Sequence, residues 1–440
     1  MKDARKTAFD ALLRVQKDHA YSNLVLDGAV RDAALLEREA SLASALFYGV
    51  LERSISLDYA LSAYLRQPLK KLKPEVLVLL RIGAYQLLYM DKIPASAAVN
   101  ETVKLAKNNK RTAFASGLIN GVLRSLQRGG VVWPDREKDL LLYVQTVYSC
   151  PAWLAELFVN SYGEENAVGI LKENFGRPPL TIRVNTQRMT ADELIDILVN
   201  EGVEAEHAAC ADALLLHKTG SVEKLKSYQE GLFHVQDLAS QYCCAALDAK
   251  PGDSVLDVCS APGGKAFTIA QMMKNQGRLT AMDLYPARTA LIARGADRLG
   301  LSVLETAVND ARVYQPGFPQ YDKVLCDVPC SGLGIIRRKP EIRLKSKEDI
   351  DKLPDLQYLI MGTSVKYVKS GGRLVYSTCT IHPQENEKVV ERFLNEHQNF
   401  RLIEVLPELP RWNGDRRMLT LLPHLHGTDG FFIAVFERMG

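Results

Sequence analysis

Residues 254–265 read Ser-Val-Leu-Asp-Val-Cys-Ser-Ala-Pro-Gly-Gly-Lys, and this stretch decides the fold of the C-terminal half. It begins as a short apolar run behind the turn residues Pro251-Gly252-Asp253, which is typical of a buried strand. The paired glycines then let the backbone approach a ligand where a helix begins. Because the loop has neither a GxGxxG nor a GxxxxGK[ST] pattern, it disfavours a dinucleotide and ATP.

Similar apolar runs recur along the C-terminal half, at residues 278–282, 323–326 and 373–377. Helix-like stretches such as 265–275 and 287–299 lie between them. This alternation predicts a Rossmann-like α/β domain over residues 236–440, with a mostly parallel, doubly wound sheet.

An acid stands at the end of each of the first three predicted strands, at Asp257, Asp283 and Asp310. A carboxylate in the position of Asp283 can accept both hydroxyls of a ribose, and Asp310 could reach an adenine amino group. The set suits a nucleoside without phosphates and predicts S-adenosylmethionine as cofactor. The alternative is that these are ordinary loop acids at polar strand ends.

Two cysteines follow the fourth and fifth predicted strands, in Asp327-Val328-Pro329-Cys330-Ser331-Gly332 and Ser377-Thr378-Cys379. Both loops should open on one crevice beside the cofactor. A thiolate that adds to carbon 6 of cytosine makes carbon 5 nucleophilic, and Asp327 could protonate ring nitrogen 3. Buried filler is the alternative for a single cysteine. The residues alone do not choose between Cys330 and Cys379 as nucleophile.

The eight cysteines show no repeated CxxC spacing, so no metal site is expected. The first 18 residues lack the apolar run of a secretory signal. The most hydrophobic stretch, 76–90, is interrupted by Arg81 and Gln86 and is too short to span a bilayer. We therefore expect a cytoplasmic protein with reduced thiols and no membrane partner.

Residues 1–130 read as an all-α domain, and residues 131–235 as a linker and a small α/β domain. We expect the small domain to take part in RNA recognition. The first 130 residues hold 20 lysines and arginines against 12 aspartates and glutamates. A solvated helix face or a phosphate-binding face would both explain the excess. The candidate RNA contacts there are Lys104, Lys107, Lys110, Arg111 and Arg124.

The helical block resembles the NusB-like RNA-binding domain. The resemblance is carried by Ala4–Phe9, Phe47-Tyr48-Gly49-Val50, Arg81–Leu87 and the stretch from Ala97 to Leu123. It implies contact with RNA without naming the RNA.

The C-terminal half resembles the RsmB/Sun proteins, within the Nop/Sun family of RNA 5-methylcytidine methyltransferases. Besides the cofactor loop and the two cysteine motifs, the matches are Arg183-Val184-Asn185, Gln236–Ser240 and Asp429-Gly430-Phe431-Phe432. Ser260, Asn309 and Thr380 depart from the common residues of the family.

This resemblance implies that Cys379 is the nucleophile and that Cys330 assists product release. It implies cofactor contacts from Asp283, Asp310, Asp327 and the loop formed by Cys259, Ser260, Ala261, Pro262, Gly263, Gly264 and Lys265. The implied substrate is cytidine 967 of 16S ribosomal RNA, free or in an assembling small subunit, with Arg183, Arg337 and Arg338 as further candidate RNA contacts.

The leading alternative from another class is a NusB-like RNA-binding factor with an inactive methyltransferase half. A methyltransferase acting on protein or on small molecules is a second alternative. Both cysteines and all three strand-end acids are present, which favours an active enzyme, and the basic helical block favours RNA as the substrate.

Overall fold

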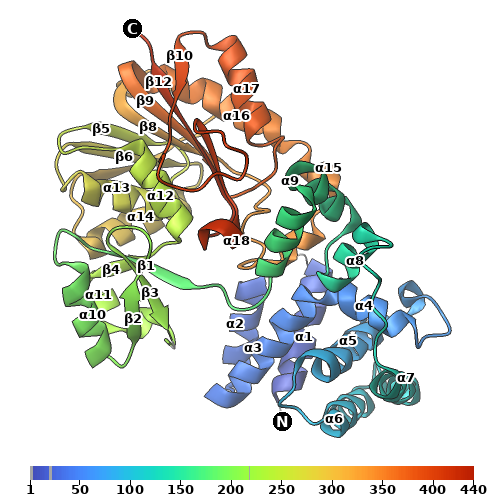
Figure 1. Ribbon diagram of the computed structural model, residues 1–440. Helices are drawn as coiled ribbons and strands as arrows, with labels where there is room; N and C mark the ends of the chain where they lie inside the picture. The colour runs from blue at the N-terminus through green and yellow to red at the C-terminus, as the bar shows by residue number, and fades with distance from the viewer. Residues whose placement is uncertain (1–2, 19–21, 218) are drawn as a thin grey trace. The chain divides into compact units, whose positions relative to one another are not determined.

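The structure is a computed structural model that describes residues 3–18, 22–217 and 219–440. The chain divides into two compact units, which are described separately. The helical unit comprises residues 1–176 together with 336–345, and the catalytic unit comprises residues 177–335 and 346–440. Figure 1 labels the elements of both. The domain boundaries expected at residues 130 and 235 stay predictions.

Helices make up the first unit, as the apolar periodicity predicted (Figure 1). Pro74 begins one of them at its first turn, where proline has no intrahelical hydrogen bond to lose. The long helices are α1 (Ala4–Asp18), α2 (Ser22–Ala33), α3 (Glu37–Glu52), α4 (Ser54–Ser62), α5 (Pro74–Tyr89), α6 (Ala95–Lys107), α7 (Ser116–Gly129), α8 (Leu140–Val147) and α9 (Ala152–Glu173).

The core of the helical unit is built around fully buried side chains such as Phe9, Phe47 and Leu57. Close helix packing depends on Gly49 of α3, because a Cβ atom there would lie 1.9 Å from the Tyr85 ring of α5. Two of the four stretches that carried the NusB-like resemblance, Phe47–Val50 and Arg81–Leu87, therefore meet in this core.

Residues 336–345 pack within the helical unit, although they follow the Cys330 loop in the sequence. They include the short 3-10 helix η4 (Pro340–Leu344). Arg337 forms an ion pair with Glu173 of α9 at 3.5 Å. The RNA contacts expected of Arg337 and Arg338 stay predictions, but the Arg337 side chain is mostly buried beside that acid.

The catalytic unit begins with a small antiparallel sheet in the order β2-β3-β1-β4. Its strands are β1 (Leu180–Val184), β2 (Glu204–His207), β3 (Ala213–His217) and β4 (Phe233–Val235), with helices α10 (Ala191–Asn200) and α11 (Lys226–Gln229). Arg183 lies on β1 and is buried, where its guanidinium binds the Ala211 carbonyl and Asp212. Its expected RNA contact stays a prediction, since the visible contacts of this side chain hold the sheet together.

The large sheet has the order β10-β12-β9-β8-β5-β6-β7, with β11 paired to β12. The five strands β5 to β9 are parallel, as predicted, whereas β12 runs antiparallel to its neighbours. The strands are β5 (Ser254–Asp257), β6 (Arg278–Asp283), β7 (Leu304–Val308), β8 (Tyr321–Asp327), β9 (Val368–Thr378), β10 (Phe400–Ile403), β11 (Met418–Leu421) and β12 (Phe431–Arg438).

Helices cover both faces of this sheet. The core on one face takes side chains from α12 (Leu238–Leu247), α13 (Gly264–Met272) and α14 (Pro286–Leu299), and the core on the other takes them from α16 (Leu353–Ser364) and α17 (Glu387–Glu396). Two shorter helices are α15 (Lys347–Ile350) and α18 (Pro423–His426). The strand order reverses direction between β5 and β8, so their carboxyl ends border the crevice in which such folds bind ligands.

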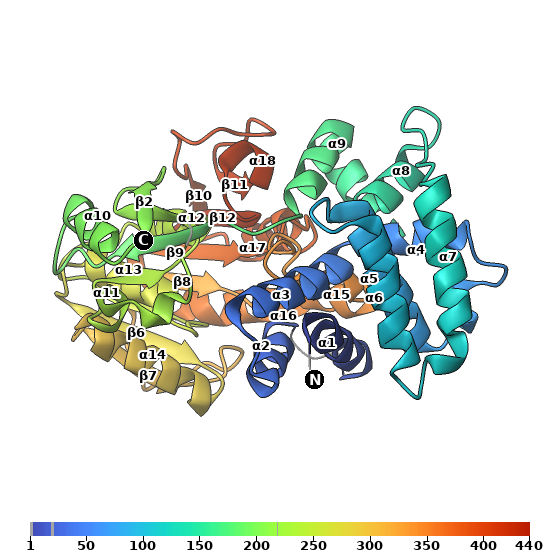
Figure 2. The same ribbon diagram turned by 90° about the horizontal axis from the view of Figure 1, so that it is seen from below.

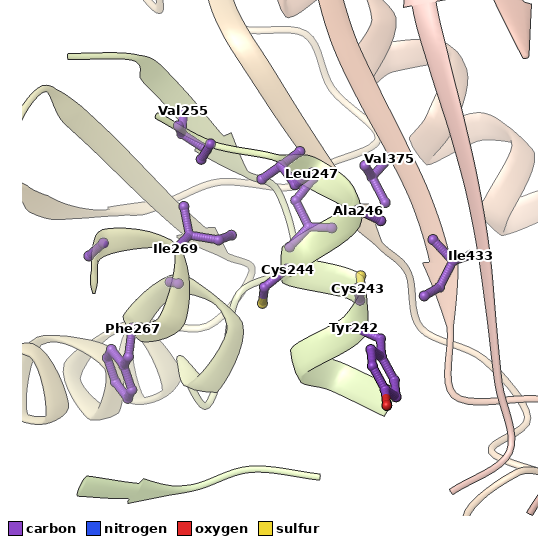
Figure 3. Close-up of a cluster of buried hydrophobic side chains, with 14 of the residues drawn as sticks. Tyr242, Cys243, Cys244, Ala246, Leu247, Val255, Phe267, Ile269, Val375 and Ile433 are labelled. Atoms are coloured by element: carbon purple, nitrogen blue, oxygen red, sulfur yellow. The ribbon is translucent and has the colours of Figure 1, made fainter. Parts of the chain in front are cut away.

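Figure 3 shows the core around α12, with Cys243 and Cys244 among aliphatic side chains of neighbouring elements. Both cysteines are fully buried, and burial raises the pKa of the Cys243 thiol to about 12. These two thiols are core filler and cannot act as exposed nucleophiles. In the part of the chain that the structure describes, no helix combines the length and apolar character needed to cross a membrane.

Candidate active site

The loop between β5 and α13 turns sharply at Gly263, whose φ of 108° is a conformation that favours glycine. A Cβ atom there would lie 2.5 Å from the Phe267 ring, so a side chain would collide with α13 itself. The glycine thus brings the first turn of α13 directly against the end of β5.

A cavity of about 620 Å³ opens at the ends of β5, β6, β7 and β8. Asp283 and Asp310 both line it, together with Cys259, Ala261 and Asp327. Apolar walls come from Leu284, Tyr285, Val328, Pro329 and Ile360. The strand-end positions of these acids predicted that they face one ligand, and the cavity brings them together.

Neighbouring groups fix the two acids of this cavity. Asp283 is buried, accepts from the backbone N–H of Ala261 at 3.3 Å and pairs with Arg288 at 3.5 Å. Asp310 pairs with Arg312 at 2.6 Å, and hydrogen bonds from Arg312 lower the pKa of Asp310 below its usual value. Both side chains thus present carboxylate oxygens to the cavity as hydrogen-bond acceptors.

The remainder of the loop faces a second, smaller cavity of about 240 Å³. Its lining contains Asp327 again, with the buried strand-end acid Asp257. The other members come from the loop and from the start of α12: Val235, Gln236, Asp237, Ser240, Ser260, Ala261, Pro262, Gly264 and Lys265. Asp327 and Ala261 border both cavities, so the loop separates two spaces that meet at the end of β8.

Lys265 lies against Asp327, with 2.8 Å between Nζ and Oδ2. Burial alone would lower the pKa of Lys265, but the carboxylate of Asp327 raises it above its usual value. Ser377 donates to the other oxygen of Asp327, also at 2.8 Å. Asp327 is thus a carboxylate held between a cation and a hydroxyl at the centre of the site.

The sulfur atoms of Cys330 and Cys379 are 3.2 Å apart, and both cysteines are free thiols. Their convergence was predicted from the two strand ends and is confirmed. Two backbone hydrogen bonds join the loops, from Val328 to the Ser377 carbonyl and from Gly334 to the Cys379 carbonyl, each at 3.1 Å. The spacing of the thiols is therefore fixed by the backbone of both loops.

A buried glutamate behind the thiols was missed in the sequence. Glu385 accepts from the backbone N–H of Ser331 and from the Gln357 side chain, each at 2.8 Å. Gln357 also donates to the Pro329 carbonyl at 3.0 Å. The polar run Pro383–Glu387, directly after a strand-end cysteine, was the available signal.

The hydrogen bond to Cys379, burial and the charge of Glu385 all raise the pKa of the Cys330 thiol well above its usual value. Cys330 therefore retains its proton more firmly than an ordinary cysteine does. Within the described ranges, no group of three His, Cys, Asp or Glu side chains could hold a metal ion.

Three family descriptions match the chain: "16S rRNA methyltransferase RsmB/F" over residues 244–437, "NusB family" over 2–128, and the ferredoxin-like domain of RsmF/B-like methyltransferases over 150–223. A Bacillus subtilis protein named "Probable ribosomal RNA small subunit methyltransferase B" is 39% identical over 99% of both chains. The chain belongs to the RsmB/F methyltransferase family. The resemblance stated from the sequence is thereby confirmed.

Solved structures agree with this family. The crystal structure titled PH0851 has a TM-score of 0.83 and 26% identity, covering 99% of this chain and 98% of its own. A methyltransferase homolog from Pyrococcus horikoshii has a TM-score of 0.60 and 27% identity, covering 68% of this chain and 99% of its own. The predicted fold class, a NusB-like domain, a small α/β domain and a Rossmann-like methyltransferase, is also confirmed.

The family's cofactor, S-adenosylmethionine, is the cofactor of this chain. The larger cavity fits it, because Asp283 and Asp310 offer acceptors for ribose hydroxyls and for an adenine amine between apolar walls. The individual cofactor contacts expected from the loop stay predictions. Cys259 and Ala261 line the larger cavity, whereas Ser260, Pro262, Gly264 and Lys265 line the smaller one.

Proposed function

We propose that this chain transfers a methyl group from S-adenosylmethionine to carbon 5 of a cytosine in 16S ribosomal RNA, through a covalent bond between Cys379 and carbon 6. The observation that carries the proposal is the 3.2 Å distance between Cys330 and Cys379 beside the cofactor cavity. The names of its relatives support ribosomal RNA as substrate, and the family resemblance supports position 967.

The two thiols have different roles in this proposal. The family resemblance assigns the attack on carbon 6 to Cys379, and Cys330, whose pKa is raised, is the assisting thiol. Attack forms the sulfur–carbon bond and gives carbon 5 the character of an enamine. Bound S-adenosylmethionine supplies the electrophilic methyl group that carbon 5 then receives. Loss of the carbon 5 proton to a base expels the Cys379 thiolate, and Cys330 assists this release from 3.2 Å.

Asp327 and Lys265 act on the pyrimidine ring in this mechanism. Negative charge that develops at ring nitrogen 3 during thiolate attack needs a proton or a strong hydrogen bond. Asp327 was a candidate to supply the proton, but it accepts hydrogen bonds from Lys265 and Ser377. We therefore assign to the Lys265–Asp327 pair a hydrogen bond to ring nitrogen 3, donated by Lys265, whose raised pKa keeps it protonated.

The test uses the full-length protein and a 16S ribosomal RNA transcript containing 5-azacytidine, which traps the covalent intermediate. The wild-type chain should form a stable adduct and Cys379→Ala should form none, whereas Cys330→Ala should accumulate an adduct with ordinary RNA. Cys210→Ala, which changes a partly buried thiol outside the thiol pair, is the matched control. Bisulfite mapping then identifies the methylated cytosine. An undiminished adduct in Cys379→Ala would overturn the mechanism, and an absence of methyl transfer by the wild-type chain would support an inactive RNA-binding factor.

A further inference from the structure

Asn309 directly follows β7 in the sequence, and its side chain lines the cofactor cavity. β7 is the edge strand of the large sheet and lies beside β6 (Figure 2). The backbone N–H of Asn309 donates to the Asp283 carbonyl at 3.0 Å, which extends the pairing of these two strands by one residue. Asn309 is therefore held beside Asp283, and the proposed methyl transfer gives it no role.

The side-chain amide of Asn309 is oriented by its neighbour Met282 on β6. Asn309 is 7% exposed, and its Nδ2 lies 3.7 Å from the sulfur of Met282. A thioether sulfur accepts hydrogen bonds but cannot donate them, so the NH₂ group of the amide faces it. Among the residues that the structure describes, none donates a hydrogen bond to Oδ1 of Asn309. Because Oδ1 is not enclosed by protein atoms either, it opens on the cavity as an available acceptor.

The walls beside this amide suit a purine ring. Met282 belongs to an apolar cluster, and three further members of that cluster line the cavity: Val258, Val328 and Ile360. A flat heterocycle is stabilised by such walls, whereas ribose hydroxyls need polar partners. The free acceptor of Asn309 thus lies next to the part of the cavity that fits the base of a nucleoside.

Asp310, the acid expected to meet the adenine amino group, is largely occupied by Arg312. The backbone N–H and the Nε of Arg312 donate to Oδ1 of Asp310 at 3.0 and 2.9 Å, and Nη2 donates to Oδ2 at 2.6 Å. A carboxylate has about four acceptor positions, so Asp310 retains little capacity for a ligand. Asn309 supplies a neighbouring acceptor that no protein group uses within the described ranges.

We propose that Asn309 selects adenine as the base of the cofactor, with its Oδ1 accepting a hydrogen bond from the 6-amino group. A purine with an oxygen at this position would place one acceptor against another. Turning the amide to meet that oxygen would bring Oδ1 against the Met282 sulfur, again two acceptors. Asn309 departs from the common residue of the family, so the resemblance does not imply this contact. The inference depends on S-adenosylmethionine as cofactor and not on which RNA base is methylated.

The experiment measures ligand binding to the full-length protein by calorimetry, without RNA. The two ligands are S-adenosylhomocysteine and S-inosylhomocysteine, which has an oxygen in place of the 6-amino group. The wild-type chain should bind the adenine ligand more tightly. Asn309→Leu, which is similar in size but has no acceptor, should weaken adenine binding by about 3- to 10-fold and reduce the preference between the ligands by the same factor. Asn309→Asp keeps an oxygen acceptor and should retain the preference.

The matched control is Asn395→Leu, which changes an exposed asparagine of α17 that does not line the cavity and should leave both affinities unchanged. Thermal unfolding checks that each variant is folded, and Asn309→Ala repeats the measurement with a side chain too small to block either ligand. An unchanged preference in Asn309→Leu and Asn309→Ala would overturn the proposal and leave the selection of adenine to Asp310. Equal weakening of both ligands would also overturn it, because that result indicates a change of cavity shape.

The same proteins separate this inference from the proposed function. If the wild-type chain prefers the adenine ligand through Asn309 but methylates no cytosine, the inference stands and the proposed function fails. If Asn309→Leu leaves the preference unchanged while the wild type methylates cytosine, the proposed function stands and the inference fails.

Discussion

The backbone N–H of Ser331, the residue after Cys330, donates a 2.8 Å hydrogen bond to the buried carboxylate of Glu385. Glu385 stands six residues after Cys379, so a single carboxylate links the chain segments that carry the two thiols. The same oxygen accepts from Gln357, which in turn holds the Pro329 carbonyl. The position of Cys330 therefore depends on Glu385, whose charge also raises the pKa of the Cys330 thiol.

Glu385→Ala should reduce kcat by about tenfold or more, because it leaves the Ser331 N–H without its acceptor and frees the Cys330 loop. The Kd for S-adenosylmethionine should change little, since Glu385 does not line the cofactor cavity. Single-turnover methylation and a cofactor titration measure the two quantities. Glu391→Ala, an exposed acid on α17, is the control. Equal losses in cofactor affinity and kcat would indicate general damage rather than loss of positioning.

Asp257→Asn should become more stable relative to the wild type as the pH rises from acidic to alkaline values. Burial raises the pKa of Asp257 from its usual 3.8 to about 7, with Asp327 adding to the effect. Between about pH 4 and pH 7 the folded state holds a proton on Asp257 that the unfolded state has released. The stability contributed by protonated Asp257 is therefore fully present below about pH 4 and is lost as pH rises through about 7. The full difference is on the order of 4 kcal/mol.

Thermal unfolding of both proteins without cofactor, near pH 5 and near pH 8, measures this difference. The Tm of the variant relative to the wild type should rise between the two conditions. Parallel pH profiles would show that Asp257 is already ionised in the folded protein.

The crevice and its thiols were predictable because strand direction follows from alternating strands and helices. Once β8 and β9 are parallel neighbours, Cys330 and Cys379 must follow adjacent carboxyl ends. The direction of β12 was not predictable, since Phe431–Phe436 is an apolar run that suits a buried strand of either direction. Glu385 was missed for a related reason: its burial comes from contacts with Ser331 and Gln357, which are distant in the sequence.

Residues 336–345 show that a basic segment in the sequence does not by itself reveal its partner. The phosphate contacts expected of Arg337 and Arg338 stay predictions, and their segment packs with α3 and α9 of the helical unit. Nothing in the local pattern distinguishes a basic loop that meets RNA from one that meets a carboxylate and backbone carbonyls of its own chain.

Lys265→Met should destabilise the catalytic unit by about 2–3 kcal/mol, because it leaves the largely buried Asp327 without its cation. Adding Asp327→Asn should recover part of that loss, since the double variant contains no unpaired charge. Denaturant unfolding measures both steps. Lys369→Met, in the more exposed pair with Asp322, should cost at most about 1 kcal/mol and is the control. An equal loss for the two lysines would contradict the burial argument.

Arg343→Lys should loosen residues 336–345 within the helical unit. Arg343 is buried and donates to the carbonyls of Glu52 and Asn174, and its guanidinium lies 4.8 Å from the centroid of the Phe175 ring. A lysine keeps the charge but lacks the planar guanidinium that donates to two carbonyls while it stacks near a ring. We therefore expect the free energy of unfolding to fall by about 2–4 kcal/mol.

Loosening of residues 336–345 should also affect the Cys330 loop. Gly334, two residues before this segment, donates a backbone hydrogen bond to the Cys379 carbonyl. Hydrogen exchange of full-length Arg343→Lys should rise in residues 336–345 and in the last turns of α3 and α9, and methyl transfer should slow while cofactor affinity is retained. Arg66→Lys, on an exposed side chain of the same unit, should change neither quantity. Faster exchange with an unchanged methylation rate would show that the anchor at Arg343 stabilises the helical unit without holding the Cys330 loop.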